Sequence, residues 1–307
     1  MVEGGQQIMP SSSLSIAVPA SLTSDVPHLR EKTLKIGLIG RAAAIFGVDQ
    51  IIIFPDDSRR KWKDEISVIS TVLSYMETPQ YLRKRLFRLR PELRYAGVLP
   101  PLRTPHHPLC STVKGLSRGE FREGVVTSHT GKGSLIDIGV ERPALVRGRK
   151  MPITTRLTVK IRNPRKKLLE AEVVDRDQTG SYWGYRITEL GNRRLGEFLK
   201  THNFDLVVAT SRNGTPFSKV SEKLSARWRV SRKKLLAFGA PAKGLYDLLE
   251  DEGYKLENIV DFVVNFVPGQ KVETIRSEEA VLLTLGVVNM IDTTIRDSRA
   301  LNFPEAH

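Results

Sequence analysis

Residues 233–253, KKLLAFGAPAKGLYDLLEDEG, decide the fold class. The first part is an apolar run that ends at Gly239 and is typical of a buried strand, and the last part has the apolar spacing of a helix. Between them Gly239, Pro241 and Gly244 predict a loop whose backbone can lie close to a ligand. A strand, a loop and a helix in this order form the repeating unit of an α/β domain with a parallel sheet.

The same alternation continues on both sides of this segment. Further strands are predicted at residues 34–40, 50–57, 204–211 and 259–268. Further helices are predicted at residues 41–48, 62–77, 79–90, 195–203, 217–228 and 276–296. We therefore expect a mostly parallel sheet with helices on both faces, built from residues 31–108 and 191–307.

A segment with a different sequence pattern separates these two halves. Residues 91–108 are rich in proline and predict irregular structure, and residues 109–190 read as short strands with Gly or Asn turns and no helix. About five such strands indicate an inserted small β-barrel, plausibly of the OB type that binds nucleic-acid strands. Residues 1–30 are rich in Ser, Gly, Pro and Gln and predict a flexible tail.

Composition narrows the class of protein. The formal net charge of +14 indicates a polyanionic partner, and nucleic acid is the best candidate. No apolar run approaches the roughly 20 residues that span a bilayer, so no membrane association is expected. The single cysteine, Cys110, excludes an internal disulfide and predicts a reducing, cytoplasmic compartment. His106 and His107 lie between prolines and predict a loop rather than a metal site.

The basic residues gather in two runs. Residues 142–169 hold ten basic residues and no acidic one, and residues 81–94 hold six basic residues and Glu92. Either run alone could be a solvated face, but two on one basic chain favour a surface that binds RNA phosphates. The residues expected to contact RNA are Arg83, Lys84, Arg88, Arg118, Lys132, Arg147, Arg149, Lys150, Arg165, Lys166 and Lys167. The barrel aromatics Tyr182, Trp183 and Tyr185 are either stacking platforms for bases or barrel core.

Three segments carry a resemblance to a known family. LLAFGAPAKGL (235–245), FVPGQKVETIRSEEAVLLTLG (266–286) and GLIGRAAAIFGVDQIIIF (37–54) are similar to motifs of the SPOUT superfamily of S-adenosylmethionine-dependent RNA methyltransferases. Along the chain, residues 37–54 come first, the basic barrel follows, and the other two segments come after the barrel. This order resembles an archaeal and eukaryotic SPOUT family with an OB-like insertion. The SpoU branch usually has Asn where this chain has Lys35, Ile36 and Gly37, so ribose 2'-O chemistry is not implied.

The resemblance implies a trefoil-knotted sheet, a homodimer and S-adenosylmethionine as the cofactor. The cofactor residues that it implies are Ala209, Thr210, Gly239, Gly244, Val267, Pro268, Gly269, Ile275 and Ala280. It implies a catalytic or RNA-binding role for Arg41, and a role in the site or in the dimer for Arg276 and Glu278. The sequence holds no metal motif.

Two other functions remain open. A non-catalytic RNA-binding factor, for example in ribosome assembly, could keep the same fold. A nucleotide-dependent enzyme of the Rossmann type is less well supported, because the chain lacks GxGxxG.

Overall fold

The computed structural model describes residues 12–57, 62–148, 150–165 and 169–300, with side chains as far as residue 291. The chain forms two compact units. The sheet unit contains the described parts of residues 1–25, 48–66 and 187–307, and the barrel unit those of residues 26–47 and 67–186. The predicted boundaries differ from this division, since residues 31–47 and 67–108 were expected in the sheet domain and instead belong to the barrel unit.

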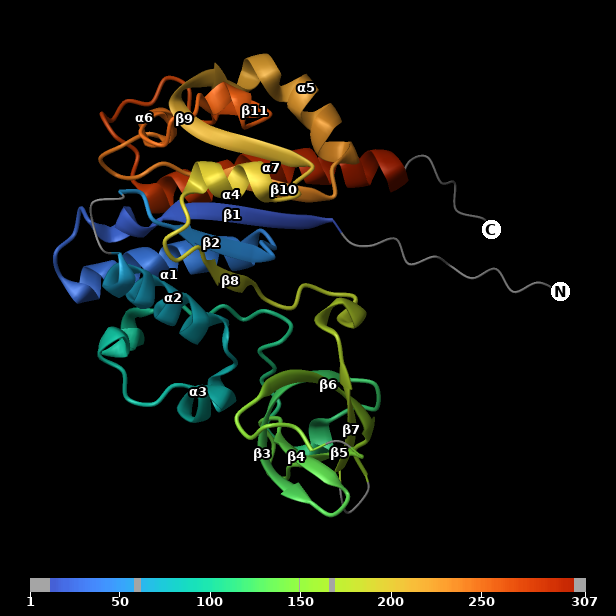
Figure 1. Ribbon diagram of the computed structural model, residues 1–307. Helices are drawn as coiled ribbons and strands as arrows, with labels where there is room; N and C mark the ends of the chain where they lie inside the picture. Colours follow the sequence, from blue (N-terminus) through green and yellow to red (C-terminus); the bar gives the residue numbers. More distant parts are fainter. Residues whose placement is uncertain (1–11, 58–61, 149, 166–168, 301–307) are drawn as a thin grey trace. The chain divides into compact units, whose positions relative to one another are not determined.

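Six strands form the sheet in the order β11-β9-β10-β1-β2-β8 (Figure 1). Their bounds are Ser13–Pro19 (β1), Gln50–Phe54 (β2), Arg186–Glu189 (β8), Leu206–Pro216 (β9), Lys233–Ala237 (β10) and Phe262–Asn265 (β11). The pairs β11–β9, β9–β10, β10–β1 and β1–β2 are all parallel. The predicted mostly parallel α/β sheet is therefore confirmed.

The strand β1 corrects the prediction of a flexible tail over residues 1–30. It pairs with β10 on one side and with β2 on the other, so it lies inside the sheet rather than at its edge. Its last five residues are buried. The serines before it and the short apolar run hid this strand, because a composition typical of loops dominated the window. Residues 1–11 lie outside the described part of the chain.

The helix α1 (Leu29–Ile45) corrects a second prediction, the strand at residues 34–40. The predicted strand contained Gly37 and ended at Gly40, but both glycines lie within this helix. A Cβ on Gly37 would come within 2.8 Å of the Leu99 side chain, and one on Gly40 within 2.8 Å of the Tyr185 hydroxyl. These glycines therefore allow close packing of a helix and do not mark the end of a strand.

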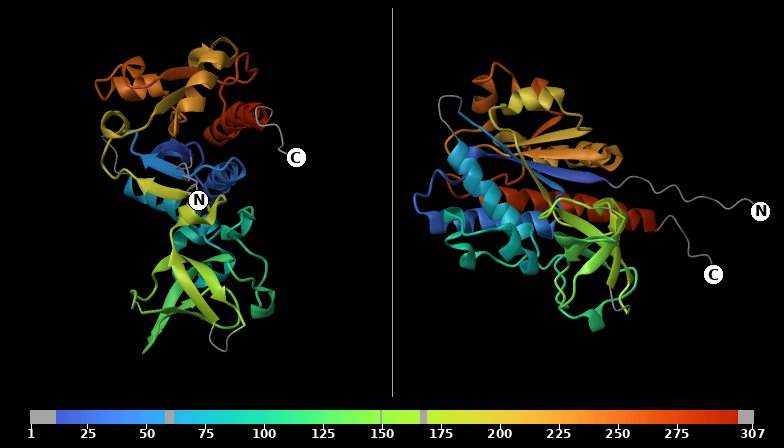
Figure 2. Two further views of the ribbon diagram at one scale, coloured as in Figure 1. Left: turned by 90° about the vertical axis from the view of Figure 1, so that its right-hand side faces the viewer. Right: turned by 60° about the horizontal axis from the view of Figure 1, so that its bottom comes forward.

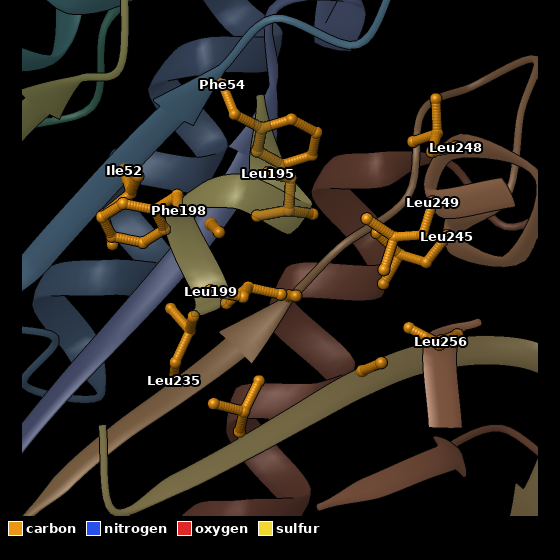
Figure 3. Packing of buried hydrophobic residues seen from close by; sticks show 14 residues of the cluster. Ile52, Phe54, Leu195, Phe198, Leu199, Leu235, Leu245, Leu248, Leu249 and Leu256 are labelled. Atoms are coloured by element: carbon orange, nitrogen blue, oxygen red, sulfur yellow. The ribbon is translucent and has the colours of Figure 1, made fainter. Parts of the chain in front are cut away.

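Four further helices belong wholly to the sheet unit: α4 (Leu195–Thr201), α5 (Phe217–Val230), α6 (Leu245–Glu250) and α7 (Ser277–Ala300). The helices α4 and α6 pack on one face of the sheet, where Leu195, Phe198 and Leu249 contact buried residues of β1, β2, β9 and β10 (Figure 3). The helices α5 and α7 contact each other and supply no residue to that cluster. Figure 2 shows α7 on the other side of the sheet from α4.

The barrel unit contains a closed barrel in the order β3-β4-β5-β7-β6. Its strands are Phe121–Thr130 (β3), Gly133–Asp137 (β4), Ala144–Arg147 (β5), Arg156–Asn163 (β6) and Leu169–Val174 (β7). Helix α3 (Gln80–Leu86) belongs to this unit, and α2 (Lys63–Glu77) ends in it. Short 3-10 turns complete the chain at Ala20–Thr23, Pro91–Leu93, Ala96–Val98, Val113–Gly115, Arg176–Thr179 and Leu256–Asn258.

A buried ionic cluster joins α2 to the barrel. The Glu77 carboxylate pairs with Arg156 at 2.5 Å and with Arg176 at 3.1 Å, and Arg156 also pairs with Glu123 at 2.6 Å. Burial acts to raise the pKa of Glu77, but a hydrogen bond from His106 and the positive charges of the two arginines lower it to about 2. The cluster fastens the last residue of α2 to the barrel strands through charges that are well paired.

Candidate cofactor pocket and nucleic-acid contacts

A pocket of about 380 Å³ lies at a bulge of β9 and at the ends of β10 and β11, and its walls come from this bulge, from the segments that follow β10 and β11, and from the start of α7. In open α/β sheets the carboxyl ends of parallel strands are the usual place for a ligand. The volume lies within the range of small-molecule sites. All of its lining residues belong to the sheet unit.

The first wall is a bulge in β9. Ala209 pairs with Val263 of β11, but the next residue of β11, Val264, pairs with Thr215. Residues 210–214 therefore leave the ladder, and the first four of them line the pocket. Bulges of this kind turn side chains toward a site. Gly214 lets β9 rejoin the ladder beside β11 at Thr215, because a Cβ on residue 214 would lie only 2.8 Å from the Val264 carbonyl carbon.

The second wall is the loop from β10 to α6. A Cβ on Gly239 would lie 3.3 Å from the Gly244 Cα, so the two ends of the loop approach closely. The Ala240 amide closes the turn by donating to the Lys243 carbonyl at 2.9 Å. Gly244 has an ordinary φ of −71°, and a Cβ there would meet only the Asp247 carboxylate, at 3.7 Å. Position 244 therefore borders open space.

The third wall is the segment after β11, which is fastened to the first. The Asn265 amide donates to the Arg212 carbonyl at 2.9 Å, and its Oδ1 accepts from the Val267 amide at 3.0 Å. The Arg212 Nη1 donates to the Glu273 carbonyl at 3.0 Å. Gly269, with a φ of 76°, makes the turn between these contacts. The bulge of β9 and the last loop are thus held together by hydrogen bonds at two points.

Most of the predicted cofactor residues meet at this pocket. Thr210, Gly239, Gly244, Val267, Ile275 and Ala280 line it. Ala209 lies in the core beneath it, and Pro268 and Gly269 form the adjoining turn outside its lining. Six of the nine predicted residues therefore line one pocket, and the contact of all nine with a cofactor stays a prediction.

Of the charged residues of the pocket, Lys243 belongs to the predicted glycine motif, and the others were not predicted. Its cations are Arg212 and Lys243, and its carboxylates are Asp247 and Glu273. Lys243 is bonded to Asp251, whereas Arg212 forms no ion pair with any residue that the structure describes. The strand end VVATSRNGTPF contained the signal for Arg212, but only the bulge reveals that this residue lines the pocket.

Arg276 and Glu278 lie beside the pocket at the start of α7, and neither lines it. Arg276 is exposed, and its backbone amide donates to the Glu279 carboxylate at 2.9 Å, which caps the helix. Glu278 is only 9% exposed. Their predicted role in the site stays a prediction.

Arg41 belongs to α1 in the barrel unit. Its Nη1 donates to the carbonyl oxygens of Pro101 and Leu102, both at 2.7 Å. These bonds fasten the proline-rich segment to the helix. They give Arg41 a structural role, and the predicted catalytic or RNA-binding role stays a prediction.

Arg83 is also used within the protein. Its Nε donates to the Thr78 carbonyl at 2.8 Å and its Nη2 to the Met76 carbonyl at 3.0 Å, and its guanidinium lies 4.5 Å from the Tyr75 ring centre. These contacts satisfy the carbonyl groups at the end of α2. We therefore find a structural role for Arg83 where RNA contact was predicted.

The other predicted RNA-binding residues fall into three groups. The first group has exposed side chains and consists of Lys84, Arg88, Arg118, Lys132, Lys150 and Arg165. Arg147 pairs with Glu170 at 2.5 Å. Arg149, Lys166 and Lys167 lie outside the described residues. One barrel tip brings Lys132 and Arg147 together, because Gly133 pairs with Arg147 across the ladder and the Gly148 amide donates to the Lys132 carbonyl at 3.0 Å.

The barrel aromatics are mostly core. Trp183 is 7% exposed and donates its indole N–H to the Glu123 carboxylate at 2.7 Å, and Tyr185 is 1% exposed and donates to the Leu73 carbonyl at 3.1 Å. Neither can stack on a base, which leaves only the half-buried Tyr182 with an accessible ring.

The histidine pair is bonded within the protein. His106 Nε2 and His107 Nε2 both bond to the Glu77 carbonyl oxygen, at 2.9 and 2.8 Å. Among the described residues no three His, Cys, Asp or Glu side chains form a group that could hold a metal ion. No helix in the described ranges combines the length and apolar character needed to cross a membrane.

Comparison with known proteins identifies the family. A family model described as "Putative RNA methyltransferase" matches residues 13–288, which is most of the chain. The chain belongs to this family. Because this is a family of methyltransferases, membership implies that the protein uses a methyl donor.

Three relatives extend the comparison. An uncharacterised protein of Halobacterium salinarum is 34% identical over 91% of this chain and 99% of its own length. The 28S rRNA (uridine-N(3))-methyltransferases of Homo sapiens and Mus musculus are 31% and 30% identical over 90% of this chain, and over 77% and 76% of their own lengths. The similarity therefore spans both units of this chain.

Proposed function

We propose that this protein transfers a methyl group from S-adenosylmethionine to N3 of a uridine in large-subunit ribosomal RNA. The observation that carries the proposal is the pocket at the bulge of β9 and the ends of β10 and β11 in a chain of the RNA methyltransferase family. The uridine N3 acceptor is the one for which the human and mouse relatives are named.

The pocket residues fit this cofactor. The volume of the pocket, about 380 Å³, suits a small ligand. The loop that contains Gly239 and Gly244 leaves backbone groups accessible beside open space. Arg212 can bind a carboxylate, and Asp247 and Glu273 can accept hydrogen bonds from hydroxyl or ammonium groups. We assign the donor to the residues that line this pocket.

The chemistry needs little from the protein beyond placement. When bound, S-adenosylmethionine supplies a methyl group already activated on a positively charged sulfur. The pocket loops would hold the donor, and placement of the acceptor nitrogen beside it would supply much of the rate enhancement. As the bond from N3 to the methyl carbon forms and the carbon–sulfur bond breaks, the proton of N3 must also leave.

We assign the handling of this proton and of the resulting charge to residues of the pocket. Asp247 and Glu273 are the carboxylates among its lining residues and are the candidate proton acceptors, with water as the final acceptor. Arg212 lines the same pocket and can stabilise the negative charge that proton loss leaves on the base.

The architecture supports the SPOUT part of the proposal. β11 lies beside β9 and not beside β10, so after β10 the chain crosses back past β9. The segment after β11 then bonds to the bulge of β9 through Asn265 and Arg212 before α7 begins. We propose that this return passage forms the trefoil knot. We also propose that the closed five-stranded barrel, with β5 and β7 parallel, is OB-like and contacts RNA.

We propose that the protein acts as a homodimer. α7 exposes apolar side chains on its outer surface: Leu282 (47%), Leu283 (44%) and Met290 (68%). A row of exposed apolar residues on one helix is typical of an interface.

The direct test is nucleoside analysis of ribosomal RNA after incubation with the protein and S-adenosylmethionine. We expect 3-methyluridine to appear by mass spectrometry, and to be absent without the donor. Methylation at another atom would overturn the uridine N3 assignment. Donor and RNA binding without any methylated product would favour the non-catalytic RNA-binding alternative.

A further inference from the structure

The largest concentration of positive charge in the sheet unit lies around α5. Residues 212–234 hold eight basic residues and one acidic residue, Glu222. The difference of eight and one is +7, which equals half of the formal +14 of the whole chain. This segment is separate from both basic runs recognised in the sequence, and it belongs to the unit that carries the pocket.

Most of this charge faces water. Of the eight basic residues, only Lys234 is buried. The exposed ones are Arg212, Lys219, Lys223, Arg227, Arg229, Arg232 and Lys233. Lys219 and Lys223 form no ion pair with any residue in the described ranges. Arg227 is partly used within the protein, because its Nη2 donates to the Asp205 carbonyl at 3.1 Å and lies 3.8 Å from Asp261. A concentration of exposed and largely uncompensated cations is the electrostatic signature of a polyanion site.

The helix arranges three of these cations in a row. Leu224 and Trp228 are buried, so this face of α5 packs inward. Lys219, Lys223 and Arg227 recur every four residues, and such residues lie above one another on a helix surface. Neighbours in the row are about 6 Å apart along the helix axis, at 1.5 Å per residue. This linear spacing suits the successive phosphates of an extended strand.

The row begins beside the pocket. β9 ends at Pro216 and α5 starts at the next residue, Phe217, whose ring lies 5.7 Å from that of the pocket residue Phe266. Arg212, within the same pocket, lies only a few residues before the helix. Figure 1 shows α5 running beside β9 and β11, which it contacts. The cations therefore extend from the pocket along the helix.

We propose that Lys219, Lys223 and Arg227, with Arg212 at the pocket, bind the phosphates of the RNA strand whose acceptor nucleotide enters the pocket. The partner is assigned as RNA because the family acts on RNA, so the inference rests on the proposed function. It adds a phosphate-binding surface within the catalytic unit that does not depend on the barrel. Phosphate contacts of this kind fix the position of a strand and do not read its sequence.

The test measures RNA binding at several salt concentrations. A Lys219→Gln, Lys223→Gln double variant removes two exposed charges and keeps the length and the helix propensity of the side chains. The probe is a fluorescently labelled single-stranded RNA of mixed sequence. The slope of the logarithm of affinity against the logarithm of salt concentration should become shallower by about 1.4, at about 0.7 for each lost phosphate contact.

A matched control keeps the total charge equal to that of the variant. Lys200 and Lys255 are exposed lysines of the same unit, near α4 and α6, and their double glutamine variant should retain the slope of the unaltered protein. Equal slopes in the two double variants would overturn the proposed row.

The outcomes separate this inference from the proposed function. A shallower slope in the α5 variant without any methylated product from the unaltered protein would support the row and contradict the enzyme. Product formation with equal slopes would support the enzyme and contradict the row. Failure of the unaltered protein to bind RNA at low salt would contradict both.

Discussion

The side-chain amide of Asn265 donates a hydrogen bond of 2.9 Å to the backbone carbonyl of Arg212. Asn265 is the last residue of β11, and Arg212 lies in the bulge of β9. The same side chain accepts from the Val267 amide at 3.0 Å. One asparagine therefore sets the positions of two walls of the pocket.

Replacing Asn265 with alanine should weaken donor binding about tenfold. The change leaves the Arg212 carbonyl and the Val267 amide without these bonds, at a cost of about 1–2 kcal/mol. Calorimetric titration with S-adenosylmethionine measures the effect. Asn203→Ala, at an exposed position after α4, is the control and should bind as the unaltered protein does. Equal affinity of both variants would show that the two walls need no fastening.

The space at Gly244 gives a sharp steric test. Its φ of −71° suits any residue, and a Cβ would meet only Asp247 at 3.7 Å, so Gly244→Ala should fold and bind the donor. Gly244→Trp should fold but fill the pocket and abolish binding. Thermal unfolding of both variants checks the fold. Donor binding by the tryptophan variant would place the donor elsewhere.

Arg41 lies in the barrel unit, so its replacement tests whether donor binding depends on the sheet unit alone. Arg41→Ala removes two bonds to the Pro101 and Leu102 carbonyls, so we expect a loss of stability of about 1–3 kcal/mol. Donor affinity should remain within a factor of two or so, because Arg41 does not line the pocket. Methyl transfer to RNA should fall. A parallel loss of donor affinity would show that this arginine belongs to the donor site.

The ionic cluster predicts sensitivity to acid. Glu77→Gln removes one of the two carboxylates that face Arg156 and Arg176, so that only Glu123 remains, and should cost about 3 kcal/mol of unfolding free energy at neutral pH. The exposed Glu189→Gln is the control and should cost little.

The sign of the pH dependence follows from the lowered pKa. The pKa of Glu77 falls from 4.5 to about 2 on folding, so its contribution is complete above pH 4.5 and is lost as the pH falls toward 2. The difference in stability between the unaltered protein and Glu77→Gln should shrink over that range. A constant difference between pH 4.5 and 2, measured by denaturant unfolding, would contradict the assignment.

Segments with a strong period were predicted well. β10 and α6 follow residues 233–253 closely, since an apolar run and a helical repeat are local properties. β1 was missed because its burial comes from β2 and β10, which are distant in sequence. The α1 glycines were misinterpreted because a turn and a close helix contact use the same residue, and only the packing partners distinguish them.

The site was predicted in part for the same reason. Gly239, Gly244 and Ile275 follow from motifs that are continuous in sequence, and they line the pocket. The bulge that brings Arg212 there depends on the register between β9 and β11, which no single segment reveals. The α5 cations were overlooked because they alternate with apolar residues, and only the helix collects them into a row.

The most direct test of the central claim is calorimetric titration of the unaltered protein with S-adenosylmethionine. We predict one saturable site on each chain, with binding lost in Gly244→Trp and kept in Gly244→Ala. Absence of binding at millimolar donor, in protein shown to be folded, would contradict the assignment of this pocket to a methyl donor.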